Sequence, residues 1–304
     1  MSADKPLVSI VVPTYKRSDR IRVALDSIAA QDYGAENIEL IVVSDNRPEW
    51  PESAETDAAV APYAASLPHF RLLHTSGQTG GGAARNYACR QATGEYLTFL
   101  DDDDEFLPDK VSTQVAFMQE NSLDMSWQDV SWYDERGRLV EHRRLDHCED
   151  FSTEGLLRAH LLTPISPTAI YMLRRDLFDR TEGFGEVATG QDWWLMLRCI
   201  EAGAHMGYMP EVHVRQYLHS GERLSLGKNK VNGEVARHEV VRGYYPRLSK
   251  KDVRYIEFRH NAVLAFAMKR NQPGQAVIYA LKAIASSPAA CVSEALKFFG
   301  KAKS

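Results

Sequence analysis

Four short apolar runs stand out in the first hundred residues of the chain. The runs span residues 8–13, 39–44, 69–74 and 95–100. They are rich in Val, Ile, Leu or aromatic residues, and the first two have the composition of strands that are buried in a parallel sheet. The pattern therefore predicts four strands in the first third of the chain.

Segments with helical spacing separate these strands. Ser18 or Asp19 can cap a helix that runs to about Gln31, since apolar residues recur there on one face. A surface helix is expected within residues 46–68, and a further helix over about 83–92. Strand–helix–strand units of this kind form right-handed crossovers between parallel strands. We therefore predict an α/β fold with a mixed, mostly parallel sheet flanked by helices.

The pattern changes twice along the remainder of the chain. Between residues 108 and 227 it is mixed, with helices expected near 110–120 and 192–202 and strands near 125–133 and 169–173. Beyond residue 228 it is helical throughout. We therefore expect an α/β domain of residues 1–227 and a helical C-terminal extension of residues 228–304.

Capping and helix-breaking residues divide this extension. Ser249 and Asp252 stand at capping-box spacing and open a helix that runs to about Arg270. Pro273 follows the end of that helix, and Pro288 separates two further helices. The extension is therefore expected to consist of several helices with short breaks.

Composition narrows the class of protein. The chain has 304 residues, of which 44% are hydrophobic and 25% charged, as in ordinary globular domains, so disordered and fibrous classes are excluded. No apolar run approaches the roughly 18 residues of a membrane span, and residues 1–6 lack the apolar stretch of a signal peptide. We expect a cytoplasmic protein. The four cysteines lie far apart and indicate neither a zinc site nor a disulfide framework.

The charges are distributed unevenly. Residues 1–227 carry 21 Lys and Arg against 36 Asp and Glu, whereas residues 228–304 carry 15 against 5. The basic extension either packs on the acidic body or faces an anionic surface such as lipid or a phosphorylated substrate. Nucleic acid is disfavoured as a partner because the extension contains no recognisable reading motif.

The last predicted helix carries an apolar stripe, formed by Val292, Ala295, Leu296 and Phe299, with lysines at its end. Such a stripe suits an interfacial helix on an anionic bilayer. It equally suits packing on the body of the protein or on a second subunit. The sequence therefore leaves open whether the C-terminal helices make a peripheral membrane contact or a homodimer.

Four consecutive carboxylates, Asp101 to Asp104, follow directly after the fourth predicted strand. Adjacent carboxylates repel one another, and a divalent cation with oxygen ligands removes that conflict. A solvated loop is the alternative interpretation. Ligands of open α/β sheets bind outside the carboxyl ends of the strands, where Pro13, Thr14 and Asp45 are also expected.

A glycine-rich loop, residues 77–82, lies between a predicted strand and a predicted helix. Such a loop can bring backbone N–H groups and a helix N-terminus close to a phosphate, although its spacing is that of neither a dinucleotide-binding nor a Walker motif. Arg85, in the first turn of that helix, could pair with a diphosphate or could simply lie at the surface.

Asp192 opens a predicted helix immediately before Trp193 and Trp194. A first-turn acid often serves only to cap a helix, and tryptophans often pack in a core. An Asp held beside aromatic rings at a pocket rim is also a plausible general base with an aromatic platform for a sugar.

Together these segments resemble glycosyltransferase family 2, the inverting, sugar-nucleotide-dependent enzymes of the GT-A fold. The likeness covers about residues 7–225 and rests on motifs in the family's order. The motifs are Val8-Ser-Ile-Val-Val-Pro-Thr-Tyr-Lys-Arg17, Leu40-Ile-Val-Val-Ser-Asp45, Gly80-Gly-Gly-Ala-Ala-Arg-Asn86, Phe99-Leu-Asp-Asp-Asp-Asp-Glu-Phe-Leu-Pro108, and Gly183-Phe-Gly-Glu with Gly190-Gln-Asp192. The resemblance implies a nucleotide-binding half of about residues 1–107 and an acceptor half of about 108–227.

The resemblance also implies roles for individual residues. Those expected to bind the nucleotide are Pro13, Thr14, Tyr15, Arg17, Asp45, Gly81, Arg85, Asp101 and Asp102. Asp103 is expected to ligate Mn²⁺ or Mg²⁺, and His219 falls where some relatives place a His near the metal or diphosphate. Asp192 is expected to be the catalytic base, and Trp193 or Trp194 to contact the acceptor.

Two residues depart from the family pattern. Ser44 stands where many relatives carry the first of two Asp residues, which leaves Asp45 as the carboxylate expected to read the base. Gln191 replaces the usual Glu before the expected base Asp192. Any help that a neighbouring carboxylate would give to this base is therefore missing.

The implied function is transfer of a sugar, most simply from a UDP-sugar, to a hydroxyl of a glycan or a lipid-linked intermediate. Two rivals remain at this stage. A nucleotidyltransferase would use the same nucleotide crevice and metal ligands but would have no use for Asp192 as an acceptor base. A catalytically silent nucleotide-sugar-binding subunit would work through the basic extension.

Overall fold

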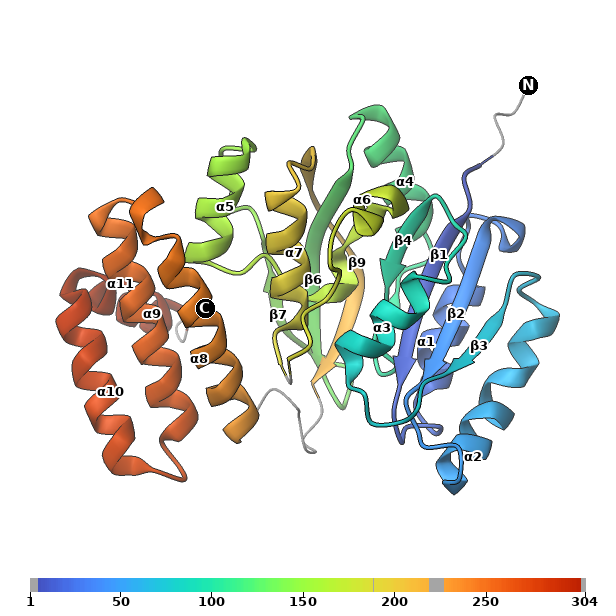
Figure 1. The fold of residues 1–304 in the computed structure, drawn as a ribbon, viewed down its shortest axis with the longest axis horizontal. Helices are drawn as coiled ribbons and strands as arrows, with labels where there is room; N and C mark the ends of the chain where they lie inside the picture. Colours follow the sequence, from blue (N-terminus) through green and yellow to red (C-terminus); the bar gives the residue numbers. More distant parts are fainter. Residues whose placement is uncertain (1–4, 188, 219–226, 302–304) are drawn as a thin grey trace. The chain divides into compact units, whose positions relative to one another are not determined.

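The structure is a computed structural model that describes residues 5–187, 189–218 and 227–301. The described residues form two compact units. Unit 1 comprises residues 5–160, 165–187 and 191–218, and unit 2 comprises 161–164, 189–190 and 227–301. Each unit is described separately below (Figure 1).

Unit 1 is built on a mixed sheet. Its strands are β1 (Val8–Thr14), β2 (Ile38–Ser44), β3 (Arg71–His74), β4 (Tyr96–Phe99), β5 (Glu105–Phe106), β6 (Met125–Asp134), β7 (Leu139–Arg143), β8 (Met172–Arg174) and β9 (Met206–Leu218). The strand order is β3-β2-β1-β4-β8-β6-β9-β5, and β7 pairs with β6. In the described chain β5, β7 and β8 run opposite to the other six strands, which confirms a mixed, mostly parallel sheet.

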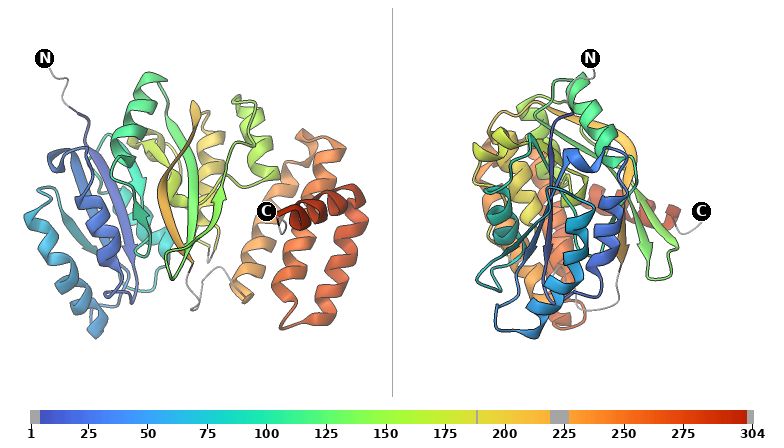
Figure 2. Two further views of the ribbon diagram at one scale, coloured as in Figure 1. Left: turned by 180° about the vertical axis from the view of Figure 1, so that it is seen from behind. Right: turned by 90° about the vertical axis from the view of Figure 1, so that its right-hand side faces the viewer.

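Helices cover both faces of this sheet. They are α1 (Ile21–Ala29), α2 (Pro51–Val60), α3 (Gly81–Cys89), α4 (Lys110–Glu120), α6 (Arg175–Asp179) and α7 (Gln191–Glu201), together with α5 (Thr153–Leu162), whose last two residues belong to unit 2. Helices α3 and α7 lie on one face and α1 on the other (Figures 1 and 2). Because both faces are covered, nearly every side chain of β1 and β2 is buried, as their continuous apolar runs predict.

The start of α1 differs from the prediction. Arg20 occupies the N-cap position and no side chain caps the helix. Ser18 instead donates a hydrogen bond from Oγ to Glu55 of α2, at 3.2 Å, and Asp19 faces Arg20 at 4.0 Å. Both candidate caps therefore have other partners, and the capping assignment was wrong.

Other strands of unit 1 also differ from the prediction, which did not include β5, β7 or β9. Residues 168–170 form a 3₁₀ turn, so the expected strand near 169–173 is shortened to β8. Strand β9 was not predicted, because Pro210 lies within it and cannot donate to a sheet ladder. The structure accommodates Pro210 at a register shift, where Gln128 of β6 pairs with Met209 and Asp129 with Val212.

Unit 2 is helical, as predicted for the extension. Its helices are α8 (Gly227–Gly243), α9 (Lys250–Met268), α10 (Pro273–Ser286) and α11 (Pro288–Lys301). The predicted cap of α9 is confirmed, because Ser249 Oγ accepts a hydrogen bond from the backbone N–H of Asp252 at 3.1 Å. Helix α10 packs along α9, and Phe258, Ala283 and Ala290 form a small core where α9, α10 and α11 meet.

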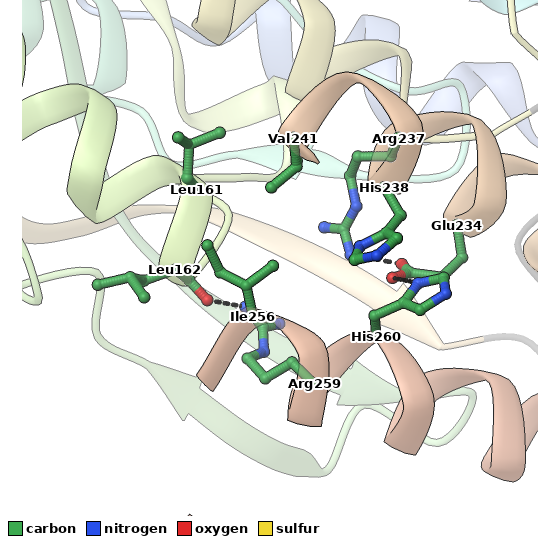
Figure 3. Close-up of a pocket in the computed structure, with 9 residues that line it drawn as sticks. All are labelled: Leu161, Leu162, Glu234, Arg237, His238, Val241, Ile256, Arg259 and His260. Carbon is green, nitrogen blue, oxygen red and sulfur yellow. Dashed lines mark hydrogen bonds and ion pairs between the residues drawn. The ribbon is translucent and has the colours of Figure 1, made fainter. Parts of the chain in front are cut away.

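A buried polar cluster joins α8 and α9 (Figure 3). The rings of His238 and His260 stack with centroids 3.7 Å apart. His260 Nδ1 lies 3.0 Å from Glu234 Oε1, and His238 Nε2 lies 3.3 Å from Glu257 Oε1. Burial, followed by the charge of His260, lowers the pKa of His238. Burial raises the pKa of Glu234, but the hydrogen bond from His260 and the charge of Arg237 outweigh it, so that the net shift is downward.

Among the described residues, one pair of helices has, when taken together, the length and apolar composition of a membrane span. No single described helix is long and apolar enough to cross a bilayer. Helix α10 and the first residues of α11 together pass the same test of length and composition, although the chain bends by 108° between them.

Candidate active site

The carboxyl ends of β1, β2 and β4 lie at one edge of the sheet. Strand β1 pairs in parallel with β2 through Thr14 and Ser44, and β4 runs parallel to β1 on its other side. The acidic run Asp101 to Asp104 begins two residues after β4 ends. This register places it beside the turn that follows Thr14 at the end of β1.

Two residues, the last of β1 and one in the turn after it, bind the acidic run. Thr14 Oγ1 donates to Asp102 Oδ2 at 2.7 Å, and Arg17 Nη1 lies 3.1 Å from Asp102 Oδ1 and 2.6 Å from Asp103 Oδ2. Burial raises the pKa of Asp102 to about 6, in spite of the opposing charge of Arg17. The repulsion expected between adjacent carboxylates is thus partly offset by one arginine.

The Asp104 carboxylate has different hydrogen-bond partners from those of its neighbours in the acidic run. Its carboxylate accepts hydrogen bonds from Gln216 Nε2 at 2.6 Å and from the backbone N–H of Tyr217 at 3.0 Å, both on β9. Burial, together with the charges of Asp101 and Asp103, raises the pKa of Asp104. Asp104 therefore anchors the acidic run to β9, a role that could not be foreseen without β9 itself.

Arg85 connects the acidic run to the helix that carries Asp192. Its Nη2 forms an ion pair with Asp101, and its Nη1 donates to Gln191 Oε1 at 3.1 Å. Arg85 is buried, and its Nε has no hydrogen-bond partner. A Cβ at Gly81 would lie 3.1 Å from Arg85 Nη1, so this glycine leaves room for the guanidinium. The structure therefore brings Gly81, Arg85, Asp101 and Gln191 together.

Asp192 lies at the start of α7, next to Gln191. Its Oδ1 accepts a hydrogen bond from the backbone N–H of Trp193 at 3.0 Å. Burial raises the pKa of Asp192, and the charge of Asp101 acts in the same direction, whereas that N–H and the charge of Arg85 oppose it. The charges of Arg85 on α3 and Asp101 after β4 therefore both act on Asp192, and its raised pKa suits an acceptor of protons.

The two tryptophans of α7 have different surroundings. Trp193 is only 2% exposed, and its ring stacks on His160 with centroids 5.4 Å apart. This packing corrects the expectation that Trp193 could contact an acceptor, because the ring is in the core. Trp194 is partly exposed and packs beside Gly185 and Arg198. The contact of Trp194 with an acceptor stays a prediction.

Asp45, at the end of β2, binds the glycine-rich loop. Its Oδ1 accepts hydrogen bonds from Thr79 N at 3.0 Å and Thr79 Oγ1 at 2.7 Å, and its Oδ2 accepts one from Gly80 N at 2.8 Å. Gly80 has a φ of 91°, a conformation that glycine adopts at low cost. Asp45 therefore shapes the loop that precedes Arg85, and the base contact predicted for it stays a prediction.

Exposed aromatic and cationic side chains adjoin Asp45. Tyr15 is 38% exposed, and its ring lies 6.3 Å from that of Trp50. Lys16 Nζ lies 3.9 Å from the centre of the Trp50 ring, and Gln78 Nε2 donates to the Tyr15 hydroxyl at 3.1 Å. Tyr15 and the glycine-rich loop that contains Gln78 were predicted from the sequence. No role was predicted for Gln78 itself or for Trp50, which belongs to no motif.

Within the described residues, the end of β4 offers a metal ion oxygen donors from Asp101 and Asp103. Among the described residues no group of three or more His, Cys, Asp or Glu side chains is arranged to hold a metal. Asp101 and Asp103 supply two carboxylates at the strand end, and their cationic neighbours are arginines that can exchange partners. One or two carboxylates plus substrate phosphates is the usual protein environment of Mg²⁺, so the residues fit such an ion. His219 lies outside the described residues.

Sequence comparison identifies related proteins. A family model described as glycosyl transferase family 2 matches residues 9–181. An uncharacterized glycosyltransferase of Rickettsia bellii is 31% identical over 194 residues, covering 60% of this chain and 26% of that protein. The putative colanic acid biosynthesis glycosyl transferase WcaA of Escherichia coli is 34% identical over 117 residues, covering 38% of this chain and 39% of WcaA. The chain thus matches well under half of the length of either relative.

Solved structures with the same fold include two with bound nucleotide sugars. TarS 1–349 of S. aureus in complex with UDP-GlcNAc has a TM-score of 0.59 at 20% identity, covering 92% of this chain and 73% of that one. The mannosyltransferase PcManGT of Pyrobaculum calidifontis in complex with GDP-Man and Mn²⁺ has a TM-score of 0.61 at 21% identity, covering 97% and 80%. These neighbours confirm the GT-A fold. Since the family model spans more than half of the sequence, the chain belongs to glycosyltransferase family 2.

Proposed function

We propose that this chain transfers a sugar from a nucleotide diphosphate donor to an acceptor hydroxyl with inversion at the anomeric carbon. One observation carries the proposal. Arg85 pairs with Asp101 of the acidic run and hydrogen-bonds Gln191, the residue next to Asp192. A cationic group suited to a diphosphate therefore stands between the expected metal ligands and the expected base.

The donor would lie along the carboxyl ends of β1, β2 and β4. The exposed ring of Tyr15 would face the base, and we keep UDP as the simplest nucleotide. The diphosphate would lie near Arg85 and the N-terminus of α3, where N–H groups and a cationic side chain favour negative charge. TarS 1–349 and PcManGT, which share the fold, bind UDP-GlcNAc and GDP-Man respectively.

Asp103, with Asp101 beside it, would hold Mn²⁺ or Mg²⁺. When bound, such an ion neutralises negative charge on the diphosphate leaving group. Arg17 already balances charge on Asp102 and Asp103, so it can keep the acidic run together in the absence of a cation. The donor-bound protein would then redistribute these contacts rather than form the site anew.

Asp192 would act on the acceptor. The acceptor oxygen attacks the anomeric carbon, the bond from that carbon to the diphosphate oxygen breaks, and the electron pair leaves with the nucleoside diphosphate. The acceptor proton passes to the Asp192 carboxylate. Trp194 offers a partly exposed ring beside this base for the sugar of a glycan or lipid-linked acceptor.

A thermal-shift panel of nucleotide sugars, with and without Mn²⁺, tests the donor class. A ligand at about 100 times its Kd stabilises the folded state by about 2.7 kcal/mol, which raises the melting temperature by several degrees. We expect one nucleotide sugar to do so with the metal, and Asp103→Asn to remove the effect. Asp179→Asn, on the distant helix α6, is the matched control and should respond like the parent protein. No shift with any nucleotide sugar would contradict the proposal.

A further inference from the structure

Helix α10 is apolar on both of its faces. Its inner side carries the small residues Ala276 and Ala283, which are buried in unit 2. Its outer side carries Val277, Ile278, Leu281 and Ile284, which are 46–62% exposed. At 100° per residue the exposed positions centre opposite the buried ones, so the outer stripe is not needed for packing on α9.

Neighbouring helices of unit 2 also carry large exposed apolar side chains. Val292 and Leu296 of α11 and Phe266 of α9 are each at least 60% exposed. The stripe predicted for the last helix is therefore exposed at Val292 and Leu296, whereas the side chains of Ala295 and Phe299 lie outside the described residues. The exposed apolar stripe along α10 itself is of the kind that marks an interaction surface rather than ordinary surface variation.

The charges in the segment that carries this stripe are mostly positive. From residue 269 to the C-terminus the chain carries six Lys and Arg against a single Glu, and the only charged residue of α10 is Lys282. Lys269 Nζ lies 3.7 Å from the centre of the Phe266 ring, so cationic and apolar groups adjoin at the end of α9. This is the composition of helices that lie in the interface of an anionic bilayer.

We propose that α10, with the exposed side chains of α11 and Phe266, docks unit 2 on the surface of an anionic membrane. A second copy of the chain is the main rival for this face. A two-fold contact would bring two basic segments of chain together, because residues 228–304 carry a net charge of +10 on each copy. An anionic lipid surface instead complements that charge. The inference stands apart from the proposed transferase activity and does not depend on it.

Vesicle co-sedimentation of the full chain tests the proposal. The probes are vesicles of phosphatidylcholine alone and vesicles with about 30 mol% phosphatidylglycerol. We expect the chain to bind the anionic vesicles and to bind them more weakly at high salt, because salt screens the attraction. Replacing Leu281→Asp and Ile284→Asp together should reduce binding by about tenfold or more, since each carboxylate would have to enter the apolar layer.

A matched pair controls for general effects of charge. Leu139 and Val140 on β7 of unit 1 are 58% and 54% exposed, so Leu139→Asp with Val140→Asp adds the same charge at equally exposed apolar positions. This control should bind like the parent protein. The variant with Leu281→Ser and Ile284→Ser keeps the charge unchanged. It tests the proposal even if the Asp variant fails to fold, and it should also bind the anionic vesicles more weakly than the parent protein.

Three results would overturn the proposal. The first is absence of binding to anionic vesicles by the parent protein. The second is equal binding by the parent and the Ser variant, which would show that charge alone acts. The third is a parent protein that is dimeric in light scattering, binds no vesicles and becomes monomeric in the Ser variant, which would assign the face to a second copy.

Discussion

Asn86 of α3 makes two hydrogen bonds that determine where the segment before α7 lies. Its Nδ2 donates to the carbonyl oxygen of Phe184 at 3.0 Å, and its Oδ1 accepts from the Phe184 N–H at 2.8 Å. Both bonds are buried, and the Phe184 ring packs against Phe99 with centroids 4.9 Å apart. Asn86 therefore fastens the chain that leads to Asp192 onto the helix that carries Arg85.

The change Asn86→Ala removes both partners and leaves the N–H and carbonyl of Phe184 unpaired in the interior. Each buried polar group without a partner costs about 1–3 kcal/mol, and partial relaxation keeps the sum near the lower end. We expect the free energy of unfolding to fall by about 2–4 kcal/mol. Turnover should fall by more than the loss of folded protein accounts for. The reason is that Gly185, next to Phe184, packs on Trp194 of α7, so that a shift of this segment would disturb the helix that carries Asp192.

Urea unfolding followed by circular dichroism measures the stability loss. Asn121→Ala is the matched control. The Asn121 side chain is exposed, and its Nδ2 donates a hydrogen bond to the carbonyl oxygen of Phe117 in α4, at 2.8 Å. We expect the control to change stability by less than about 0.5 kcal/mol. Equal stabilities of the two variants would refute the reasoning that Asn86 clamps this segment.

Three further predictions concern acid–base behaviour and helix capping. Because the folded protein raises the pKa of Asp192, the rate of sugar transfer should fall as pH drops through a value above the ordinary 3.8, and this acid limb should disappear from the residual activity of Asp192→Asn in a pH–rate profile. Ser249→Ala removes the cap of α9 and should lower stability by about 1 kcal/mol in urea unfolding, whereas an unchanged midpoint would show that the cap contributes nothing. The pKa of His238 is lowered on folding, so the unfolded chain binds more protons just below pH 6.5 and stability should fall as pH drops through that region; His238→Gln should flatten the pH dependence of the urea midpoint there.

The parts of the fold that were predictable from the sequence are those set by local pattern. The continuous apolar runs of β1 and β2 are sufficient to indicate strands covered on both faces, and the Ser249 cap depends on residues three positions apart. Strand β9 was not predicted from the sequence, because a proline such as Pro210 is unfavourable in a central strand. The structure accommodates Pro210 through a shift in the pairing register between β9 and β6. A shift of that kind depends on the partner strand, which local pattern does not specify.

The candidate site likewise has features that the sequence pattern predicts and features that it does not. Motif order indicated the acidic run, the glycine-rich loop and Asp192, since each adjoins a strand or helix with a clear pattern. The bond from Arg85 to Gln191 joins residues 106 positions apart, and the burial of Trp193 depends on its packing against His160. Asp45 turns its carboxylate toward a loop some 35 residues later in the chain. Such long-range contacts follow from the tertiary fold, so the sequence could name these residues but not their partners.

Turnover of the nucleotide sugar identified by the thermal-shift panel tests the central claim most directly. The measurement is the release of nucleoside diphosphate in the presence of Mn²⁺ by the parent protein and by Asp192→Asn, with the sugar passing to an added glycan or to water. Donor binding is measured in parallel by calorimetry. The account predicts that the variant binds the donor normally and releases product about 10²–10⁴-fold more slowly, the range typical of loss of a general base. Equal rates for the two proteins, or donor binding without turnover by the parent, would contradict it.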